Sequence, residues 1–135
     1  MSVSVLFMSM SLDGYIADPH DYLGGEDDHR LHNWFAPAGK PVEQTGLVAE
    51  LMDELRTSAG AVVAGRRTAE LMDHWGGDHD GLPMFVPSHR PPPPPVRWGY
   101  PLVTYVADGI ASAMAQAKEA AGDRNVHMVG GYTAR

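Results

Sequence analysis

A short apolar run followed by two arginines constrains the fold of this 135-residue chain more than any other feature of its sequence. Residues 60–64 (GAVVA) contain two valines and are bounded by glycines, which is typical of a strand buried on both faces of a sheet. Gly65 follows, and glycine can adopt backbone conformations that are closed to other residues. Arg66, Arg67 and Thr68 come next, so a buried strand leads through a glycine turn to two guanidinium groups.

This turn has the residues of a phosphate site. Thr68 is expected to be the N-cap of a short helix over residues 69–74. Free backbone N–H groups at a helix N-terminus attract anions, and the planar guanidinium of arginine matches a phosphate group. The segment therefore predicts a phosphate site that includes Gly65, Arg66, Arg67 and Thr68. The alternative is an ordinary surface turn with two solvated arginines.

The composition excludes several classes of protein. The chain has no cysteine, which excludes a disulfide framework, a thiolate zinc site and cysteine catalysis, and which fits a cytoplasmic location. Its net charge of −7 disfavours general nucleic-acid binding, which depends on many cationic contacts to phosphates. No apolar run approaches the roughly 20 residues that span a bilayer. We therefore expect one domain over residues 1–135 that binds neither nucleic acid nor a membrane.

Strand-like and helix-like segments alternate along the chain, which predicts an α/β fold with a central, mostly parallel sheet. We expect strands at residues 3–10, 60–64, 84–87, 102–106 and 126–129, with the first strand near the centre of the sheet. We expect helices from residue 45 onward, over residues 69–74 and over residues 110–121. Asp108 is expected to cap the last helix and Gly122 to end it. The five prolines at 91–95 predict a stiff polyproline-II connection.

Polar or glycine residues directly follow four of the predicted strands. They are Asp13 and Gly14, residues 65–68, Ser88 with His89 and Arg90, and Gly130 with Gly131. Because ligands of open parallel sheets bind beyond the carboxyl ends of the strands, these groups predict a site for a ligand with several phosphates. Asp13 is either a functional carboxylate at that edge or the cap of its own turn.

Two common kinds of ligand site are not expected. The G-x-G-x-x-G motif of an ordinary Rossmann domain is absent after the first strand. The histidines and carboxylates in the loops over residues 18–32 and 74–81 lack a specific metal-ligand spacing, so we expect no metal site.

Four segments, in this order, closely resemble the dihydrofolate-reductase-like family. They are SLDGYIA after the first strand, VVAGRRTAE in the middle, FVPSHRPP, and VTYVADGIASAMAQAKEAAGDRNVHMVGG. The resemblance covers nearly the whole chain, and the nearest branch contains the C-terminal reductase domain of the riboflavin-biosynthesis deaminase/reductase. It implies a three-layer α/β fold, NADPH as the cofactor, a small-molecule substrate and a possible homodimer.

The resemblance also assigns expected roles to single residues. The turn that holds the cofactor phosphates matches Gly65, Arg66, Arg67 and Thr68. The segment that receives the adenosine 2′-phosphate and the adenine matches Ser88, His89 and Arg90. The glycine turn that lets the backbone approach the pyrophosphate matches Gly130 and Gly131. The acidic position beside the nicotinamide and the substrate matches Asp13. An arginine partner for the extra phosphate also explains an expected preference for NADPH over NADH.

Two features depart from the family. None of the acidic residues on the first helix (Glu50, Asp53, Glu54) can be assigned to pterin recognition, so folate reduction is not expected. The family continues past the glycine turn with a helix and further strands, whereas this chain ends at Arg135, so a C-terminal truncation is expected. The leading hypothesis is an NADPH-dependent reductase of a small heterocyclic or carbonyl/imine substrate. The alternatives are the riboflavin-pathway reductase, which acts on a ribosylated aminopyrimidine, and a nucleotide-binding or inactive fragment.

Overall fold

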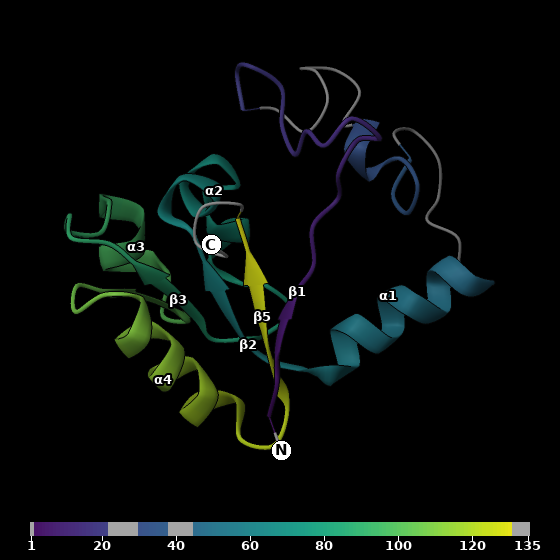
Figure 1. Cartoon of the computed structure of the whole chain (residues 1–135). Coiled ribbons are helices and arrows are strands. Elements are labelled where there is room, and N and C mark those ends of the chain that lie inside the picture. Colours follow the sequence, from purple (N-terminus) through teal and green to yellow (C-terminus); the bar gives the residue numbers. More distant parts are fainter. Residues whose placement is uncertain (1, 22–29, 38–44, 131–135) are drawn as a thin grey trace. The chain divides into compact units, whose positions relative to one another are not determined.

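A five-stranded parallel sheet organises the fold (Figure 1), in a computed structural model that describes residues 2–21, 30–37 and 45–130. The strands are β1 (Ser4–Leu6), β2 (Ala59–Ala64), β3 (Met84–Pro87), β4 (Val103–Val106) and β5 (Asn125–Val129). They lie in the order β1-β5-β2-β3-β4, and each neighbouring pair is parallel. The predicted α/β fold with a parallel sheet is confirmed.

β2 lies at the centre of the sheet. All six of its residues are buried, and it pairs with β5 on one side and β3 on the other, as its continuous apolar run predicts. The prediction of a central first strand is wrong. β1 is only three residues long and lies at the edge of the described sheet, beside β5. Its Ser-Val-Leu sequence lacks the apolar run that a strand covered on both faces needs.

The described residues form four helices and two 3-10 helices in addition to the strands. They are α1 (Leu47–Ser58), α2 (Arg66–Leu71), α3 (Pro94–Gly99), α4 (Ile110–Ala121), η1 (Arg30–His32) and η2 (Asp73–Gly77). α4 has the predicted bounds, and Gly122 ends it with a φ of 61°. In the part of the chain that the structure describes, no helix has the length and apolar character needed to cross a bilayer.

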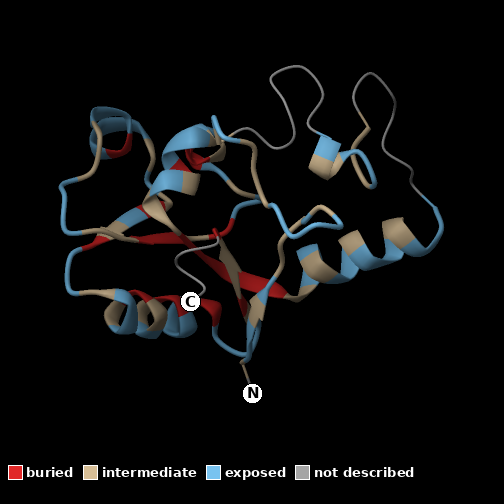
Figure 2. Ribbon diagram, turned by 45° about the horizontal axis from the view of Figure 1, so that its top comes forward, coloured by how far each residue is buried: buried red, intermediate tan, exposed pale blue. Residues whose placement is uncertain are grey.

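The sheet is covered on both faces, and the two cores are formed by alternate strand residues. Figure 2 shows that the buried residues are concentrated in the central strands. One core combines α4 with residues of β2 and β3, such as Ala117, Val63 and Phe85. The other combines Ala69 of α2 and Val96 of α3 with the intervening strand residues. The sheet thus lies between two helical layers, which is the expected three-layer arrangement.

Two predicted helix caps are wrong. α2 begins at Arg66 with Gly65 as its N-cap, so Thr68 lies in the first turn. The helix starts this early because the chain turns directly at the end of β2, where the Gly65 N–H bonds the Val129 carbonyl at 3.1 Å. Gly65 has φ −62° and ψ 140°, values that any residue adopts, so its backbone does not require glycine. Gly109, not Asp108, is the N-cap of α4.

The polyproline prediction is wrong for the end of the run. α3 begins at Pro94, and Pro93 precedes it in an extended conformation with φ −66° and ψ 158°. Proline lacks a backbone N–H, and the first N–H groups of a helix have no partner within the helix. Proline therefore fits the first turn of a helix, and Pro94 and Pro95 initiate α3.

The contacts divide the chain into two compact units, which we describe separately. Unit 1 contains residues 1–7 and 58–135 and holds the sheet, and unit 2 contains residues 8–57. In unit 2, the rings of Trp34 and Phe35 meet edge to face at 4.8 Å. Nε1 of Trp34 donates a hydrogen bond to Oγ of Ser9 at 3.1 Å. The single domain over residues 1–135 stays a prediction.

Candidate functional site

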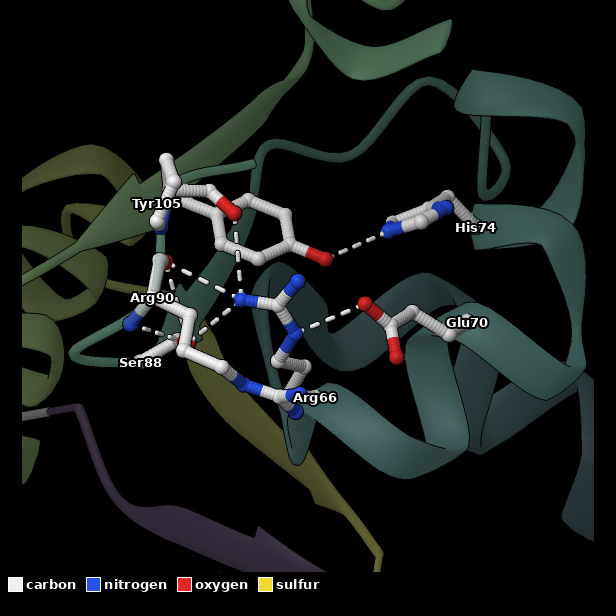
Figure 3. Close-up of polar contacts among 7 residues, drawn as sticks. Arg66, Glu70, His74, Ser88, Arg90 and Tyr105 are labelled. Carbon is white, nitrogen blue, oxygen red and sulfur yellow. Dashed lines mark hydrogen bonds and ion pairs between the residues drawn. The ribbon is translucent and has the colours of Figure 1, made fainter. Parts of the chain in front are cut away.

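Arg66 joins α2 to the segment that follows β3 (Figure 3). Its Nη1 donates hydrogen bonds to Oγ of Ser88 at 2.9 Å and to the carbonyl oxygens of Arg90 and Pro91 at 3.0 and 3.1 Å. Its Nε donates to Oε1 of Glu70, one helical turn later, at 2.7 Å. Four hydrogen bonds therefore fix the plane of one guanidinium group at the carboxyl ends of β2 and β3.

Tyr105 of β4, which is hydrogen-bonded to His74 of η2, supports this guanidinium. The Arg66 Cζ lies 5.3 Å from the centre of the Tyr105 ring, within the range of a cation–π contact. The Tyr105 hydroxyl and Nε2 of His74 are hydrogen-bonded at 2.8 Å. We call the group formed by Arg66, Glu70, His74, Ser88, Arg90 and Tyr105 the Arg66 cluster (Figure 3).

His74 is the buried member of the Arg66 cluster. Its side chain is 3% exposed, and its Nδ1 is buried without a hydrogen-bond partner among the described residues. Burial lowers the pKa of His74, against the carboxylates of Asp73 and Glu70, which raise it. Burial likewise raises the pKa of Tyr105. The pair is therefore neutral near pH 7, and its hydrogen bond joins two uncharged groups.

A left-handed turn holds His74 in place. The φ angles of Asp73, His74 and Trp75 are 45°, 52° and 53°, and those of Gly76 and Gly77 are 68° and 83°. Left-handed conformations cost non-glycine residues roughly 1–2 kcal/mol each, so other contacts must maintain this turn. Tyr100 supplies two of them. Its hydroxyl bonds the Asp73 carboxylate at 3.1 Å, and its ring fills the space that a Cβ on Gly77 would need.

The end of β5 meets the start of α2 at Gly130. A Cβ on Gly130 would lie 2.8 Å from Oγ1 of Thr68 and 3.3 Å from the backbone nitrogen of Gly65. Gly130 also has a φ of 103°, which side-chain-bearing residues rarely adopt. Only glycine fits here without displacement, so the glycine turn after β5 lies directly against the arginine turn after β2.

The charge of this edge is mainly positive. Arg66, Arg67 and Arg90 follow β2 and β3, and Glu70 is the carboxylate bonded to Arg66. The side chains of Arg67, His89 and Arg90 are exposed. Because α2 has only six residues, the expected attraction of a helix N-terminus for an anion is weak, and the arginines carry this prediction.

The structure brings together six of the residues proposed from the sequence. They are Gly65, Arg66, Thr68, Ser88, Arg90 and Gly130, which are linked by the contacts described above. Arg67 and His89 lie on the same segments with exposed side chains. Gly131 lies outside the described residues. Their roles in binding a cofactor stay predictions.

Asp13 belongs to unit 2, so it is described apart from the Arg66 cluster. Its side chain is exposed, and the Ser11 hydroxyl donates a hydrogen bond to its Oδ1 at 2.6 Å. The N–H of Tyr15 in turn donates to Oγ of Ser11 at 2.9 Å. Asp13 therefore takes part in a local turn through Ser11, and its role beside a substrate stays a prediction.

The sequence analysis missed Glu70, His74 and Tyr105. The spacing of Arg66 and Glu70 is the i, i+4 spacing of helical ion pairs, so that contact could have been found. Tyr105 shares a face of β4 with Val103, which strand alternation indicates. His74 gave no such signal, because its position depends on the left-handed turn. Among the described residues, no group of three or more His, Cys, Asp or Glu side chains could hold a metal ion.

Comparison with known proteins finds similarity among solved structures. No protein-family model and no curated protein matches the chain. Among solved structures, the chain is similar to a protein from Shewanella sp. PV-4 that is provisionally described as a riboflavin biosynthesis protein, with 29% sequence identity and a TM-score of 0.66. The match covers 98% of this chain and 67% of that one. The predicted dihydrofolate-reductase-like α/β fold is thereby confirmed, whereas the predicted truncation stays a prediction.

Proposed function

We propose that the protein is an NADPH-dependent reductase of a small heterocyclic or carbonyl/imine substrate. One observation carries the proposal: residues from the ends of three parallel strands meet at one edge. Arg66 bonds Ser88, and Gly130 lies against Thr68. Ligands of parallel sheets bind at such an edge. The similarity to a protein assigned to riboflavin biosynthesis supports a reductase rather than another nucleotide-binding function.

The residues at this edge fit the phosphate-bearing part of a dinucleotide. Arg67 and Arg90 are exposed residues at this edge, and their guanidinium groups would form charge-assisted hydrogen bonds with phosphate oxygens. The absent side chain of Gly130 brings the turn after β5 against Thr68, so a pyrophosphate bound at the arginine turn would also lie near the backbone of the β5 turn. Bound NADPH would supply the hydride. The protein would hold its phosphates, and Asp13 would orient the substrate or hold a proton.

A second candidate is the reduction of the ribosylated aminopyrimidine of riboflavin biosynthesis. The description of the Shewanella protein favours it, because the similarity extends over 98% of this chain. Turnover of that pyrimidine with NADPH would select this candidate. Binding of NADPH without turnover of any pyrimidine, imine or carbonyl compound would favour the third alternative, a nucleotide-binding chain without catalysis.

A titration with NADPH and NADH tests the proposal. A ligand that binds only the folded state raises the melting temperature, so NADPH should raise it more than NADH at equal concentration. Arg90→Ala should weaken NADPH binding about tenfold, the loss expected for one charge-assisted hydrogen bond. The Arg90 carbonyl that accepts from Arg66 belongs to the main chain and survives this change.

Arg97→Ala is the matched control for that variant. Arg97 is an exposed arginine in the last turn of α3, so its removal changes the net charge equally without altering the Arg66 cluster. NADPH binding by the control should stay within about twofold of the original protein. Equal losses in the two variants, or no melting shift with NADPH, would contradict the proposal.

A further inference from the structure

The guanidinium group of Arg66 is held more firmly than that of a surface arginine. Its side chain is 16% exposed, and Nε and Nη1 together donate four hydrogen bonds. Three of the acceptors belong to Ser88, Arg90 and Pro91, in the segment after β3. The orientation of Arg66 and the conformation of that segment are therefore coupled.

Tyr105 supplies the surface on which this guanidinium rests. Its ring lies 5.3 Å from Cζ of Arg66, and Tyr105 is paired with Val86 in the β3–β4 register. β3 also leads directly to Ser88, so the ring and the loop are fixed by the same pair of strands. The ring of Tyr105 cannot swing away freely, because its hydroxyl is hydrogen-bonded to His74.

His74 is itself fixed from a third direction. It lies in the left-handed turn of η2, and its ring packs against the Tyr100 ring at 5.9 Å. Tyr100 also bonds Asp73, the preceding residue of the same turn. A continuous series of contacts therefore runs from Tyr100 through His74 and Tyr105 to Arg66. Figure 3 shows the part of this series from His74 to Arg66.

We propose that Tyr105, anchored by His74, is a positioning residue that holds Arg66 and the Ser88–Pro91 segment in the conformation that selects a 2′-phosphorylated dinucleotide. This inference rests on the proposed NADPH binding. A phosphate dianion gains most from a guanidinium whose orientation is fixed before binding, because less ordering is needed on association. NADH lacks the 2′-phosphate, so its binding should depend much less on Tyr105 than NADPH binding does.

Two variants of Tyr105 test this inference. Tyr105→Leu removes both the ring and the hydroxyl, and it should weaken NADPH binding about fivefold, the loss expected for a partly buried cation–π contact. NADH binding should change less than about twofold. Tyr105→Phe keeps the ring and removes only the bond to His74, so it provides the test even if the leucine variant fails to fold. Its NADPH binding should weaken about twofold.

Phe85→Leu is the control for a general loss of stability. Phe85 is a buried aromatic residue of β3 on the α4 side of the sheet, away from the Arg66 cluster. It should lower the melting temperature without changing the ratio of NADPH to NADH affinity. A Tyr105→Leu protein that keeps the original ratio would overturn the inference.

A second readout does not depend on the cofactor. The Arg66 Nε–H, assigned in NMR spectra by its loss in Arg66→Lys, should exchange with water several-fold faster in Tyr105→Leu and at the original rate in Phe85→Leu. If the protein binds neither dinucleotide, the proposed function fails, but faster exchange still upholds the positioning of Arg66 by Tyr105. An unchanged exchange rate in Tyr105→Leu would overturn that positioning whatever the protein binds.

Discussion

The two faces of the sheet in unit 1 are held together in different ways. Against α4 the contacts are between small and apolar side chains, and a Cβ on Gly60 would lie 2.8 Å from Cα of Ala121. On the opposite face, near the carboxyl edge, the core contains His74 and partly buried Tyr105, next to Arg66. Buried polar groups cost free energy unless they are hydrogen-bonded, and Nδ1 of His74 has no partner among the described residues.

This difference separates stability from recognition. Tight apolar packing stabilises the α4 face, and nothing in it prefers one ligand over another. The opposite face contains a strained turn and a buried imidazole, which reduce stability, and a fixed guanidinium, which under the proposed function helps to set where the cofactor phosphate binds. Changes on the α4 face should therefore affect the free energy of unfolding alone, and changes in the Arg66 cluster should also affect binding.

The largest effect on stability is expected at Gly60. In Gly60→Ala, the new Cβ would lie 2.8 Å from main-chain atoms of Ala121 and from Cβ of Arg124, so β2 and α4 must separate. The free energy of unfolding, measured with urea, should fall by about 3 kcal/mol. The folded protein should keep its ratio of NADPH to NADH affinity. A changed affinity ratio with unchanged stability would contradict the expectation that the α4 face affects stability and not binding.

Gly130→Ala should be next in size and should affect both properties. Gly109→Ala is a matched control, because Gly130 and Gly109 have φ angles of 103° and 93°, but an added Cβ would have neighbours within 4 Å at Gly130 and none at Gly109. Each variant should lose about 1–2 kcal/mol of stability through backbone strain. Only Gly130→Ala should also weaken NADPH binding, by about tenfold, because it displaces Thr68 and the start of α2. Equal binding by the two variants would exclude a cofactor contact at Gly130.

Acid should destabilise the protein through His74. Burial places its pKa in the folded state below the ordinary value of 6.5, while Asp73 and Glu70 raise it and Arg66 lowers it. The folded state then binds fewer protons than the unfolded state between these two pKa values, so stability is fully present above pH 6.5 and is lost as pH falls toward the folded pKa. This one group contributes a slope of at most about 1.4 kcal/mol per pH unit.

The variant His74→Gln tests whether His74 causes the loss of stability in acid. Urea unfolding between pH 7.5 and pH 5 should give a smaller slope for His74→Gln than for the original protein. Part of the slope should remain, because burial also lowers the pKa of His127. An identical slope in the two proteins would show that His74 is not the group responsible.

The smallest effect concerns two ion pairs of equal length. Arg66–Glu70 and Arg56–Asp53 both have N–O distances of 2.7 Å, but the side chains of the first pair are 16% and 38% exposed and those of the second 61% and 62%. Glu70→Gln should cost up to about 1 kcal/mol, and Asp53→Asn less than about 0.5 kcal/mol. Thermal melts of the two variants give the comparison. Equal losses would mean that Glu70 contributes nothing beyond a surface ion pair.

The α4 face of the sheet was largely predictable from the sequence, because its elements follow from local patterns of apolar residues. The continuous run of β2 indicated a buried strand, and the alanine spacing with a terminal glycine gave the bounds of α4. The convergence of the arginine turn, Ser88 and Gly130 also followed from a general rule about parallel strands. The start of α2 and the N-cap residues of α2 and α4 did not, because Gly65 and Gly109 cap their helices without a side-chain hydrogen bond.

The support of Arg66 was not predictable in the same way. Tyr100 and Tyr105 lie far from Arg66 in the sequence, and His74 lies in a loop. The pairing of β3 with β4 brings Tyr105 near Arg66, where its hydroxyl bonds His74. Three consecutive non-glycine residues with positive φ contradict local preference, so the turn of η2 depends on tertiary contacts such as the Tyr100–Asp73 bond. A turn that depends on tertiary contacts cannot be predicted from local sequence patterns.

Amide chemical shifts on adding adenosine 2′,5′-bisphosphate and, separately, adenosine 5′-monophosphate test the central claim most directly, because the two ligands differ only in the 2′-phosphate. We expect the bisphosphate to shift the amides of residues 65–68, 88–90 and 130 and to leave those of α4 unchanged, with smaller shifts from the monophosphate. Equal shifts from both ligands, or shifts confined to residues outside the carboxyl edge of the sheet, would contradict a 2′-phosphate site at the Arg66 cluster.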